Sequence, residues 1–278
     1  MIPASHAVVH SESIPSWQQE IAQSLRTPDQ LINYLQLPAE SIHKIVGGHR
    51  EFPIRATESY LQRIEPGNPN DPLLRQILPT THELELLPGY GGDPVGDCAA
   101  LRGNGILHKY HGRVLLITTS SCGIHCRYCF RRHYPYRDHS LSPSSISDVC
   151  SWIEGDSTIH EVILSGGDPL MISNQRLDQL ITQLEEIPQL RTIRFHTRMP
   201  IIAPSRLDQS LIKRLQCSRL NIVMVIHSNH PNELDHSVEK SLNSVANSRI
   251  TLLNQSVLLN GVNNRVSTLE SLSHRLFE

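Results

Sequence analysis

Three cysteines lie within eight residues of one another and could bind a metal cluster. They are Cys122, Cys126 and Cys129, and their spacing is C-x3-C-x2-C. Thiolates are the usual protein ligands of iron–sulfur clusters. Three thiolates on one short loop can bind three irons of a four-iron cluster, which leaves the fourth iron free for a small chelating ligand. The spacing therefore predicts a [4Fe–4S] cluster with one open iron.

Two other interpretations of these cysteines stay open. A structural zinc site needs a fourth ligand, and His125 and His133 are close in the sequence. A disulfide would leave an odd thiol and requires an oxidising compartment. Neighbouring arginines favour thiolates and anionic ligands; they are Arg127, Arg131 and Arg132. The other cysteines are scattered, and we expect them to be small buried apolar residues; they are Cys98, Cys150 and Cys217.

A second unusual segment, Ser165-Gly166-Gly167-Asp168-Pro169, follows an apolar run at residues 161–164. Two glycines let the backbone approach a ligand closely, and Asp168 offers an acceptor for an ammonium group. The alternative is a tight turn in which Asp168 caps a helix. The segment therefore predicts either a binding loop or a turn.

The elements that must position these residues are strands and helices in alternation. Five predicted strands are apolar runs at residues 114–117, 161–164, 192–195, 220–226 and 250–253, the last continuing to 257–258. A helical stripe runs from Leu177 to Ile187. This alternation favours a parallel sheet with both faces covered. In such barrels function lies at the C-terminal ends of the strands, where the cysteines, the glycine segment, His227 and Gln255 all stand. We therefore predict an α/β fold, a partial (β/α) barrel with one active face.

The first hundred residues differ from the rest, because they show short helical patterns separated by turn-rich stretches. Thr27-Pro28-Asp29-Gln30 is a good helix start, with Thr at the cap, Pro at the first position and Gln at the third. Residues 65–72 and 86–97 are rich in Pro, Gly, Asn and Asp. We therefore predict a mainly helical N-terminal region over residues 1–104 and the barrel over residues 105–278.

Composition excludes some classes of partner. The 278 residues carry a formal net charge of −2, so no charge imbalance points to nucleic acid. No segment approaches the roughly 18 apolar residues of a membrane span. The first fifteen residues lack a basic stretch followed by an apolar one, so they do not resemble a secretory signal. We expect a cytoplasmic protein with no nucleic-acid or membrane partner.

Five segments, in order along the chain, resemble the lysine 2,3-aminomutase family of radical S-adenosylmethionine (SAM) enzymes. They are LHKYHGRVLLITTSSCGIHCRYCFRR, ILSGGDPL, HTRMPIIAPSR, HSNHPNE and LLNQSVLLNGVN. The resemblance covers the chain from about residue 60 to its C-terminus. Within the family, NPNDPLLRQILP and CRYCFRRHYPY are most similar to the branch whose product modifies elongation factor P. The resemblance implies a radical SAM barrel, a [4Fe–4S] cluster, SAM and pyridoxal 5′-phosphate (PLP).

The resemblance also implies roles for single residues. Cys122, Cys126 and Cys129 match the cluster ligands. The residues that match SAM contacts are Ser165, Gly166, Gly167, Asp168, His227 and Gln255. Lys109 and Arg113 match basic positions on the PLP phosphate, and Arg131 matches the arginine that pairs with the substrate carboxylate. Without the resemblance, all of these basic residues could be solvated surface residues.

The chain departs from the family near its end. The family binds PLP through a lysine in a glycine-rich segment, and none of the four lysines here stands in one; they are Lys44, Lys109, Lys213 and Lys240. Ser267-Thr268-Leu269-Glu270 is a capping box that opens a helix with no Gly or Pro stop. A radical SAM core has six strands, and five are found. We therefore expect a shortened member of the family that lacks the PLP lysine. Asn264 also replaces an acidic residue that the family uses for free lysine.

These expectations combine into one function. We expect a radical SAM, PLP-dependent lysine 2,3-aminomutase that converts L-α-lysine to (R)-β-lysine. A partner ligase would attach this product to elongation factor P, and a flavodoxin or ferredoxin would supply the electron. Two alternatives stay open: a metabolic aminomutase of free lysine or glutamate, and an inactive remnant that binds a cluster or zinc without turnover.

Overall fold

The computed structural model describes residues 16–38, 48–85, 87–136 and 138–278. The first fifteen residues, on which the expectation about a secretory signal rests, lie outside these ranges, and so does Lys44. Among the described residues, no helix has both the length and the apolar character that crossing a membrane requires.

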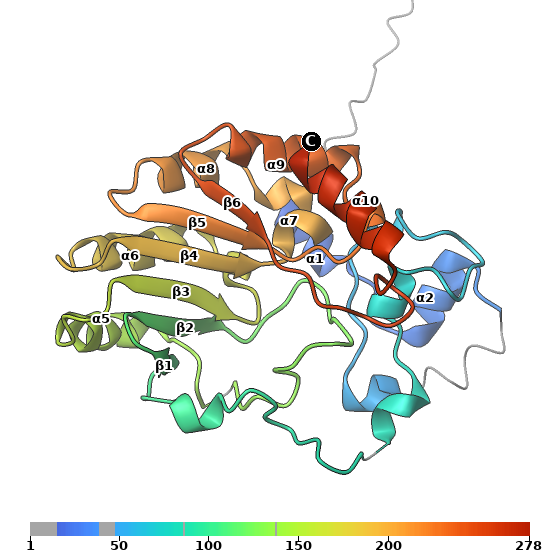
Figure 1. Ribbon diagram of the computed structural model, residues 1–278, viewed down its shortest axis with the longest axis horizontal. Helices are drawn as coiled ribbons and strands as arrows, with labels where there is room; N and C mark the ends of the chain where they lie inside the picture. Colours follow the sequence, from blue (N-terminus) through green and yellow to red (C-terminus); the bar gives the residue numbers. More distant parts are fainter. Residues whose placement is uncertain (1–15, 39–47, 86, 137) are drawn as a thin grey trace, which may run out of the picture.

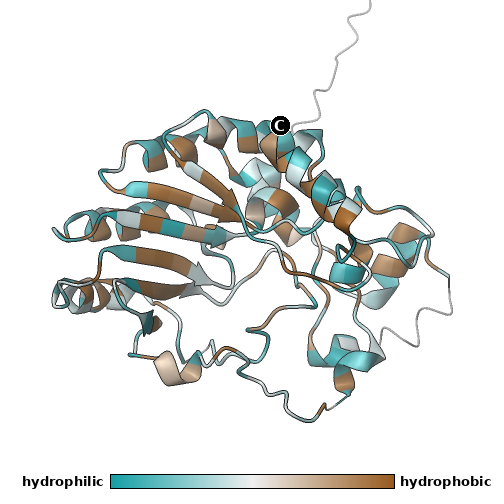
Figure 2. Ribbon diagram, in the orientation of Figure 1, coloured by the Kyte–Doolittle hydropathy of each residue, from teal (hydrophilic) through white to brown (hydrophobic). Residues whose placement is uncertain are grey.

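A six-stranded sheet is the centre of the fold, in the order β1-β2-β3-β4-β5-β6 (Figure 1). Its strands are β1 (Ile106–Tyr110), β2 (Arg113–Thr119), β3 (Glu161–Gly166), β4 (Thr192–Thr197), β5 (Asn221–Ile226) and β6 (Thr251–Asn254). Strands β2 to β6 are parallel, so the five predicted strands and the α/β class are confirmed. Figure 2 shows these strands largely in the colour of hydrophobic residues.

Two details of the sheet differ from the prediction. Strand β1 pairs antiparallel with β2 and was missed, because its second half is exposed and its sequence, ILHKY, has no continuous apolar run. The fifth predicted strand ends at Asn254, before Val257 and Leu258. Both of these side chains are exposed and lie in the loop after β6, so their apolar character did not indicate a buried strand.

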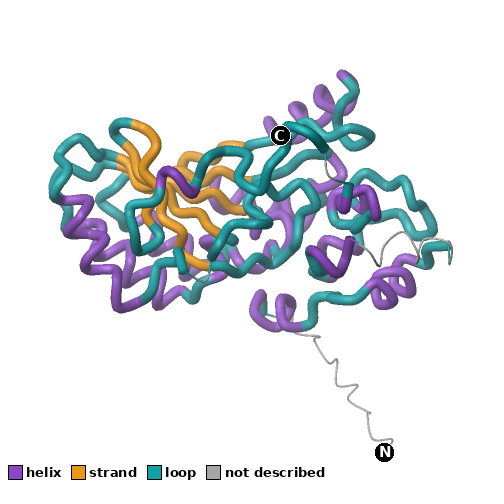
Figure 3. Tube along the Cα trace, turned by 90° about the horizontal axis from the view of Figure 1, so that it is seen from below, coloured by secondary structure: helices purple, strands orange, loops and turns teal. Residues whose placement is uncertain are grey.

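Helices follow the parallel strands and pack along one face of the sheet. They are α5 (Ile146–Glu154), α6 (Asn174–Glu185), α8 (Gln209–Gln216) and α9 (His236–Ala246), and Figure 3 shows helices gathered on one side of the strands. The predicted stripe on α6 is confirmed, because Leu177, Leu180, Ile181 and Leu184 are buried. The face opposite these helices is less fully covered than the prediction of two covered faces implies. On β4, for example, Ile193 and Phe195 are buried, whereas Arg194 and His196 on the opposite face are half-buried.

Most of the N-terminal region lies beyond the C-terminal ends of the parallel strands (Figure 1), whereas the segment Cys98–Ala100 packs beside β1. It contains α1 (Trp17–Ala22), α2 (Pro28–Leu35) and α4 (Glu58–Leu61), with short 3-10 helices at Leu74–Gln76, Thr81–Leu84 and Cys98–Ala100. The predicted start of α2 is confirmed by a capping box. The Thr27 hydroxyl accepts a hydrogen bond from the Gln30 backbone N–H, and the Gln30 side-chain oxygen accepts one from the Thr27 backbone N–H. Apolar residues from Trp17 to Leu272 form one buried cluster, and the boundary at residue 104 stays a prediction.

The remaining helices connect or follow the strands. Short 3-10 helices lie at Pro143–Ser145, Pro169–Met171, Pro204–Arg206 and Pro231–Glu233, and the α-helices are α7 (Met199–Ile202) and α10 (Val266–Phe277). The predicted capping box of α10 was wrong, because the helix begins at Val266, before that box, and its N-cap Arg265 makes no side-chain cap bond. The Ser267 position is therefore already inside the helix.

Truncation of a core phenylalanine should cost far more than truncation of a surface one. Phe195 on β4 is fully buried, whereas Phe277 on α10 is 90% exposed. We expect Phe195→Ala to lower the free energy of unfolding by about 3–5 kcal/mol. The matched variant Phe277→Ala should change it by less than about 0.5 kcal/mol. Urea denaturation followed by circular dichroism measures both, and equal losses would contradict this description of the core.

Candidate functional site

A cavity at the C-terminal ends of the parallel strands brings together most of the residues singled out in the sequence. Its lining includes Cys122, Cys126, Cys129, Arg131, Ser165, Gly166, Gly167, Asp168, His196, Arg198, His227, Asn229 and Gln255. Residues more than a hundred positions apart therefore line one cavity. Lys109 and Arg113 do not line this cavity.

The cysteine loop follows β2 and is held from outside by the N-terminal region. Backbone N–H groups of His125 and Arg127 donate to the carbonyls of Arg55 (3.0 Å) and Gln76 (2.8 Å). The Arg127 guanidinium donates to the Glu83 carboxylate and to the Phe52 carbonyl at 2.7 Å. The region that the sequence left without a role therefore fixes the conformation of the loop.

The three thiols of this loop share one electrostatic environment. All are free and half-buried. Burial raises the pKa of the Cys122 thiol well above its ordinary value, and the neighbouring Asp168 and cysteines raise it further. Burial likewise raises the pKa of Cys129, with Cys126 adding to the effect. Three thiolates crowded in an apolar cavity repel one another, so they need positive charge from a bound metal centre.

A zinc site at this loop finds little support in the side chains. The His125 ring bonds to the Pro53 carbonyl through Nδ1 at 2.8 Å and stacks on Phe52, outside the lining of the cavity. Within the described ranges, no group of three or more His, Cys, Asp or Glu side chains is arranged to hold a metal ion. A four-iron cluster needs no such convergence, because each cysteine binds a different iron.

The glycine segment packs against the start of the cysteine loop. The N–H groups of Gly167 and Asp168 donate to the carbonyls of Thr119 (2.7 Å) and Ser121 (2.8 Å). A Cβ on Gly167 would lie 2.2 Å from the Ser121 oxygen, and Gly166 has a φ of +123°. From the sequence, these glycines were expected to let the backbone approach a ligand or to form a tight turn. The structure shows that they already serve the approach of a neighbouring backbone.

Asp168 is buried and caps the short helix Pro169–Met171, as the alternative interpretation held. One carboxylate oxygen accepts from the Leu170 N–H at 3.0 Å and from the Thr197 hydroxyl at 2.7 Å. The other accepts from the N–H groups of Arg198 (2.7 Å) and Met199 (3.2 Å). Burial still raises the pKa of this carboxyl. Asp168 therefore links the ends of β3 and β4, and its oxygens have little capacity left for a ligand.

Two histidines also line the cavity. His196 on β4 and His227 after β5 meet edge to face at 5.8 Å between ring centroids. Burial lowers the pKa of His196 to about 4 and that of His227 to about 3, so both rings are neutral at pH 7. Nε2 of His227 is buried without a hydrogen-bond partner. An unsatisfied buried nitrogen in a cavity wall fits a ligand with polar groups, such as an adenosine.

A second cavity lies beside the first. Its lining includes Val95, Asp97, Lys109, Tyr110, Arg113, Phe130 and Arg131, and the last two of these also line the first cavity. The Asp97 carboxylate is buried and pairs with both Lys109 and Arg131, at 2.6 Å from Arg131 Nε. Arg131 also donates to the Ser165 hydroxyl at 3.2 Å. Lys109, Arg113 and Arg131 are thus brought together on one surface.

Sequence reasoning missed several buried polar residues around the site. Asp97 stands in a turn-rich stretch that gave no signal, and Arg198 was visible only as part of the His-Thr-Arg segment after the third strand. The expectation that the other cysteines are buried was wrong for two of them. Cys98 and Cys217 are exposed, because both stand at the ends of short helices, and Cys150 is half-buried.

Acid should destabilise the fold through His227. In an unfolded chain this group has a pKa near 6.5, and burial lowers it to about 3. Between these values the unfolded chain binds a proton that the folded chain does not, so the free energy of unfolding falls as pH falls. From pH 7 to pH 5 the loss due to His227 should be about 2 kcal/mol.

Urea denaturation at both pH values tests this expectation. His227→Gln should remove that part of the pH dependence, whereas His133→Gln, at an exposed histidine, should keep it. The same pH dependence in wild type and His227→Gln would contradict the assignment.

The chain resembles known proteins along most of its length. Residues 116–245 match the model of the radical SAM superfamily. The chain is 38% identical to L-lysine 2,3-aminomutase of Escherichia coli (strain K12) over 97% of its own length and 79% of that protein. It is 39% identical to L-lysine 2,3-aminomutase of Haemophilus influenzae, over 95% of its own length and 78% of that protein.

A solved structure described as native anSMEcpe with bound AdoMet is 14% identical, with a TM-score of 0.47 over 59% of this chain and 48% of that one. The two aminomutases carry the assignment, because each is matched over nearly the whole of this chain. With the radical SAM region at its centre, the chain belongs to the L-lysine 2,3-aminomutase family of radical SAM enzymes.

Proposed function

We propose that Cys122, Cys126 and Cys129 hold a [4Fe–4S] cluster whose open iron binds SAM in the first cavity. The observation that carries this proposal is the meeting of three free thiols, the glycine segment and the unsatisfied His227 in the lining of one cavity. When both groups are bound and the cluster is reduced, the cluster and SAM would supply the chemistry of hydrogen abstraction by a carbon radical. The protein's part is to orient them and to keep water out.

The SAM contacts divide between backbone and side chains. Ser165, Gly166 and Gly167 offer backbone groups at the cavity wall, and we assign the SAM amino group to this segment together with Asp168. The four bonds that Asp168 already accepts favour the backbone as the main contact. His227 and Gln255, which line the same cavity, are the side chains we assign to the adenosine.

We assign the second cavity to PLP. Lys109 and Arg113 would hold the phosphate, and a cluster of cations beside exposed Tyr110 fits an anionic aromatic group. When bound, PLP supplies a carrier for the migrating amino group. Among the described lysines, Lys109 pairs with Asp97, and Lys213 and Lys240 are exposed on α8 and α9. None of these three offers a second amine in the cavity.

The substrate we propose is L-lysine, with Arg131 on its carboxylate. Arg131 lines both cavities, so a substrate held there would reach from the PLP side to the SAM side. The relatives named L-lysine 2,3-aminomutase support this choice. The finer proposal is (R)-β-lysine as the product, for attachment to elongation factor P by a partner ligase. A flavodoxin or ferredoxin would supply the electron, in the cytoplasm.

Loss of any one cluster cysteine should abolish iron binding and SAM cleavage. After anaerobic reconstitution with iron and sulfide, the wild type should hold about four irons per chain. With dithionite it should release 5′-deoxyadenosine from SAM. Cys122→Ala, Cys126→Ala and Cys129→Ala should lose most of the iron and all cleavage. Cys217→Ala, at an exposed thiol, should keep both. Bound zinc in place of iron would overturn the proposal.

β-Lysine in the same assay, with lysine and PLP added, would identify the reaction. Chromatography against both enantiomers tests the stereochemistry, and glutamate in place of lysine tests the metabolic alternative. Iron binding with no SAM cleavage would instead favour the inactive remnant.

Removal of the Lys109 charge should weaken PLP binding. A charged hydrogen bond to phosphate contributes about 1.5–3 kcal/mol, so Lys109→Gln should raise the dissociation constant of PLP about tenfold or more. Equilibrium dialysis with PLP measures this, and Lys213→Gln, at an exposed lysine, is the matched control. Equal affinities in Lys109→Gln and the wild type would contradict the phosphate assignment.

A further inference from the structure

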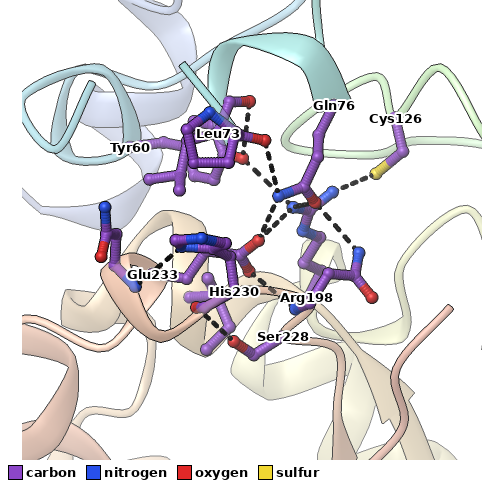
Figure 4. A network of polar contacts seen from close by, with 12 residues as sticks. Tyr60, Leu73, Gln76, Cys126, Arg198, Ser228, His230 and Glu233 are labelled. Carbon is purple, nitrogen blue, oxygen red and sulfur yellow. Dashed lines mark hydrogen bonds and ion pairs between the residues drawn. The ribbon is translucent and has the colours of Figure 1, made fainter. Parts of the chain in front are cut away.

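A buried arginine contacts one of the three cavity cysteines directly. Arg198 follows β4, is 5% exposed, and its Nη1 lies 2.7 Å from Cys126 Sγ (Figure 4). Within the described ranges, no other side chain donates a hydrogen bond to any of the three thiols. An arginine stays protonated in proteins, so this contact places a permanent positive charge against one sulfur.

Surrounding groups fix the position of that charge. The other terminal nitrogen of Arg198 donates to Gln76 Oε1 at 2.7 Å, and lies 3.4 Å from Glu233 Oε1 (Figure 4). Gln76 in turn donates to Glu233 at 2.6 Å. The rings of Tyr60 and Tyr128 lie 5.4 and 5.5 Å from the guanidinium carbon. The guanidinium therefore has little freedom to turn away from Cys126.

The network has one buried acid, Glu233, whose carboxylate pairs with Arg198. Glu233 is fully buried, and its backbone carbonyl accepts from Arg63, a second cation. The Arg63 guanidinium is otherwise bonded to the Ser59 and Ile201 carbonyls and lies 3.9 Å from the half-exposed Asp235. One buried carboxylate therefore stands against two buried cations, Arg198 and Arg63, and offsets only part of their positive charge. Burying the Arg198–Glu233 ion pair is costly, and stability alone does not account for it. Apolar residues of similar size could pack the same elements together without that cost.

We propose that Arg198 is a positioning residue that donates to the Cys126 thiolate and raises the reduction potential of the cluster. The proposal rests on the proposed cluster ligands. In the reduction, one electron passes from a low-potential donor to the cluster, and no bond is made or broken. The added negative charge is stabilised by a nearby cation, and hydrogen bonds to the sulfurs shift the potential in the same direction.

Two substitutions of Arg198 separate charge from structure. Arg198→Gln and Arg198→Lys both lose the planar fork to Gln76 and Glu233, but only Arg198→Lys keeps the charge. At the wild-type midpoint potential, Arg198→Gln should lower the ratio of reduced to oxidised cluster about tenfold, which is 59 mV for one electron. Arg198→Lys should recover most of that loss. A merely structural role predicts equal shifts in both variants.

Glu233→Gln should shift the reduction potential of the cluster in the opposite direction. Removal of its negative charge leaves Arg198 less compensated, so the ratio of reduced to oxidised cluster should rise at the wild-type midpoint. This variant keeps the proposal falsifiable if Arg198→Gln does not fold. Arg214→Gln, at a surface ion pair with Asp178 and Glu185 on the outer helices, should leave the potential unchanged.

The measurement is a redox titration of the reconstituted full chain, followed by electron paramagnetic resonance without lysine or PLP. A lower potential in Arg198→Gln with recovery in Arg198→Lys, or a higher one in Glu233→Gln, supports the proposal. Unchanged potentials, or equal shifts in both Arg198 variants, overturn it while the cluster assignment stands. If the wild type holds no cluster, the proposed function fails first and this inference falls with it.

Discussion

The backbone contact between the ends of β2 and β3 is the constraint on which the site depends. Gly167 and Ser121 approach so closely that no room is left between them for a single methyl group. Two hydrogen bonds, from Gly167 to Thr119 and from Asp168 to Ser121, close this contact. Because the cysteine loop begins at the next residue, the contact decides where the thiols enter the cavity. The carboxylate of Asp168 then extends the same connection to β4.

The N-terminal region completes the site from the other side. Its backbone carbonyls accept from the cysteine loop, and its Gln76 and Tyr60 side chains surround the guanidinium of Arg198. The thiols thus lie between a sheet edge and a helical layer, with one buried cation against Cys126. Such an environment supplies positive charge where the reduction of a bound cluster would add negative charge. The region is therefore part of the site rather than an appendage to it.

The sequence predicted the parts of this fold that are repeated and local, and it missed those that depend on distant contacts. Five parallel strands were visible as apolar runs, and the start of α2 was visible in its cap. Strand β1 was not, because an edge strand needs no apolar run. Asp97, Gln76 and Glu233 gave no signal, since their partners stand far away in the chain. The sequence identified the two glycines as a place of close approach, but the group that approaches them is the chain's own backbone.

The central claim is that the cavity holds a four-iron cluster with one iron open to SAM. Electron paramagnetic resonance of the reduced, reconstituted protein, recorded with and without SAM, tests it most directly. Binding of SAM at an open iron changes the symmetry of that iron, so we predict a clear shift in the spectrum. A reduced four-iron signal that SAM leaves unchanged would contradict the account, because the cavity would then hold a cluster with no open iron.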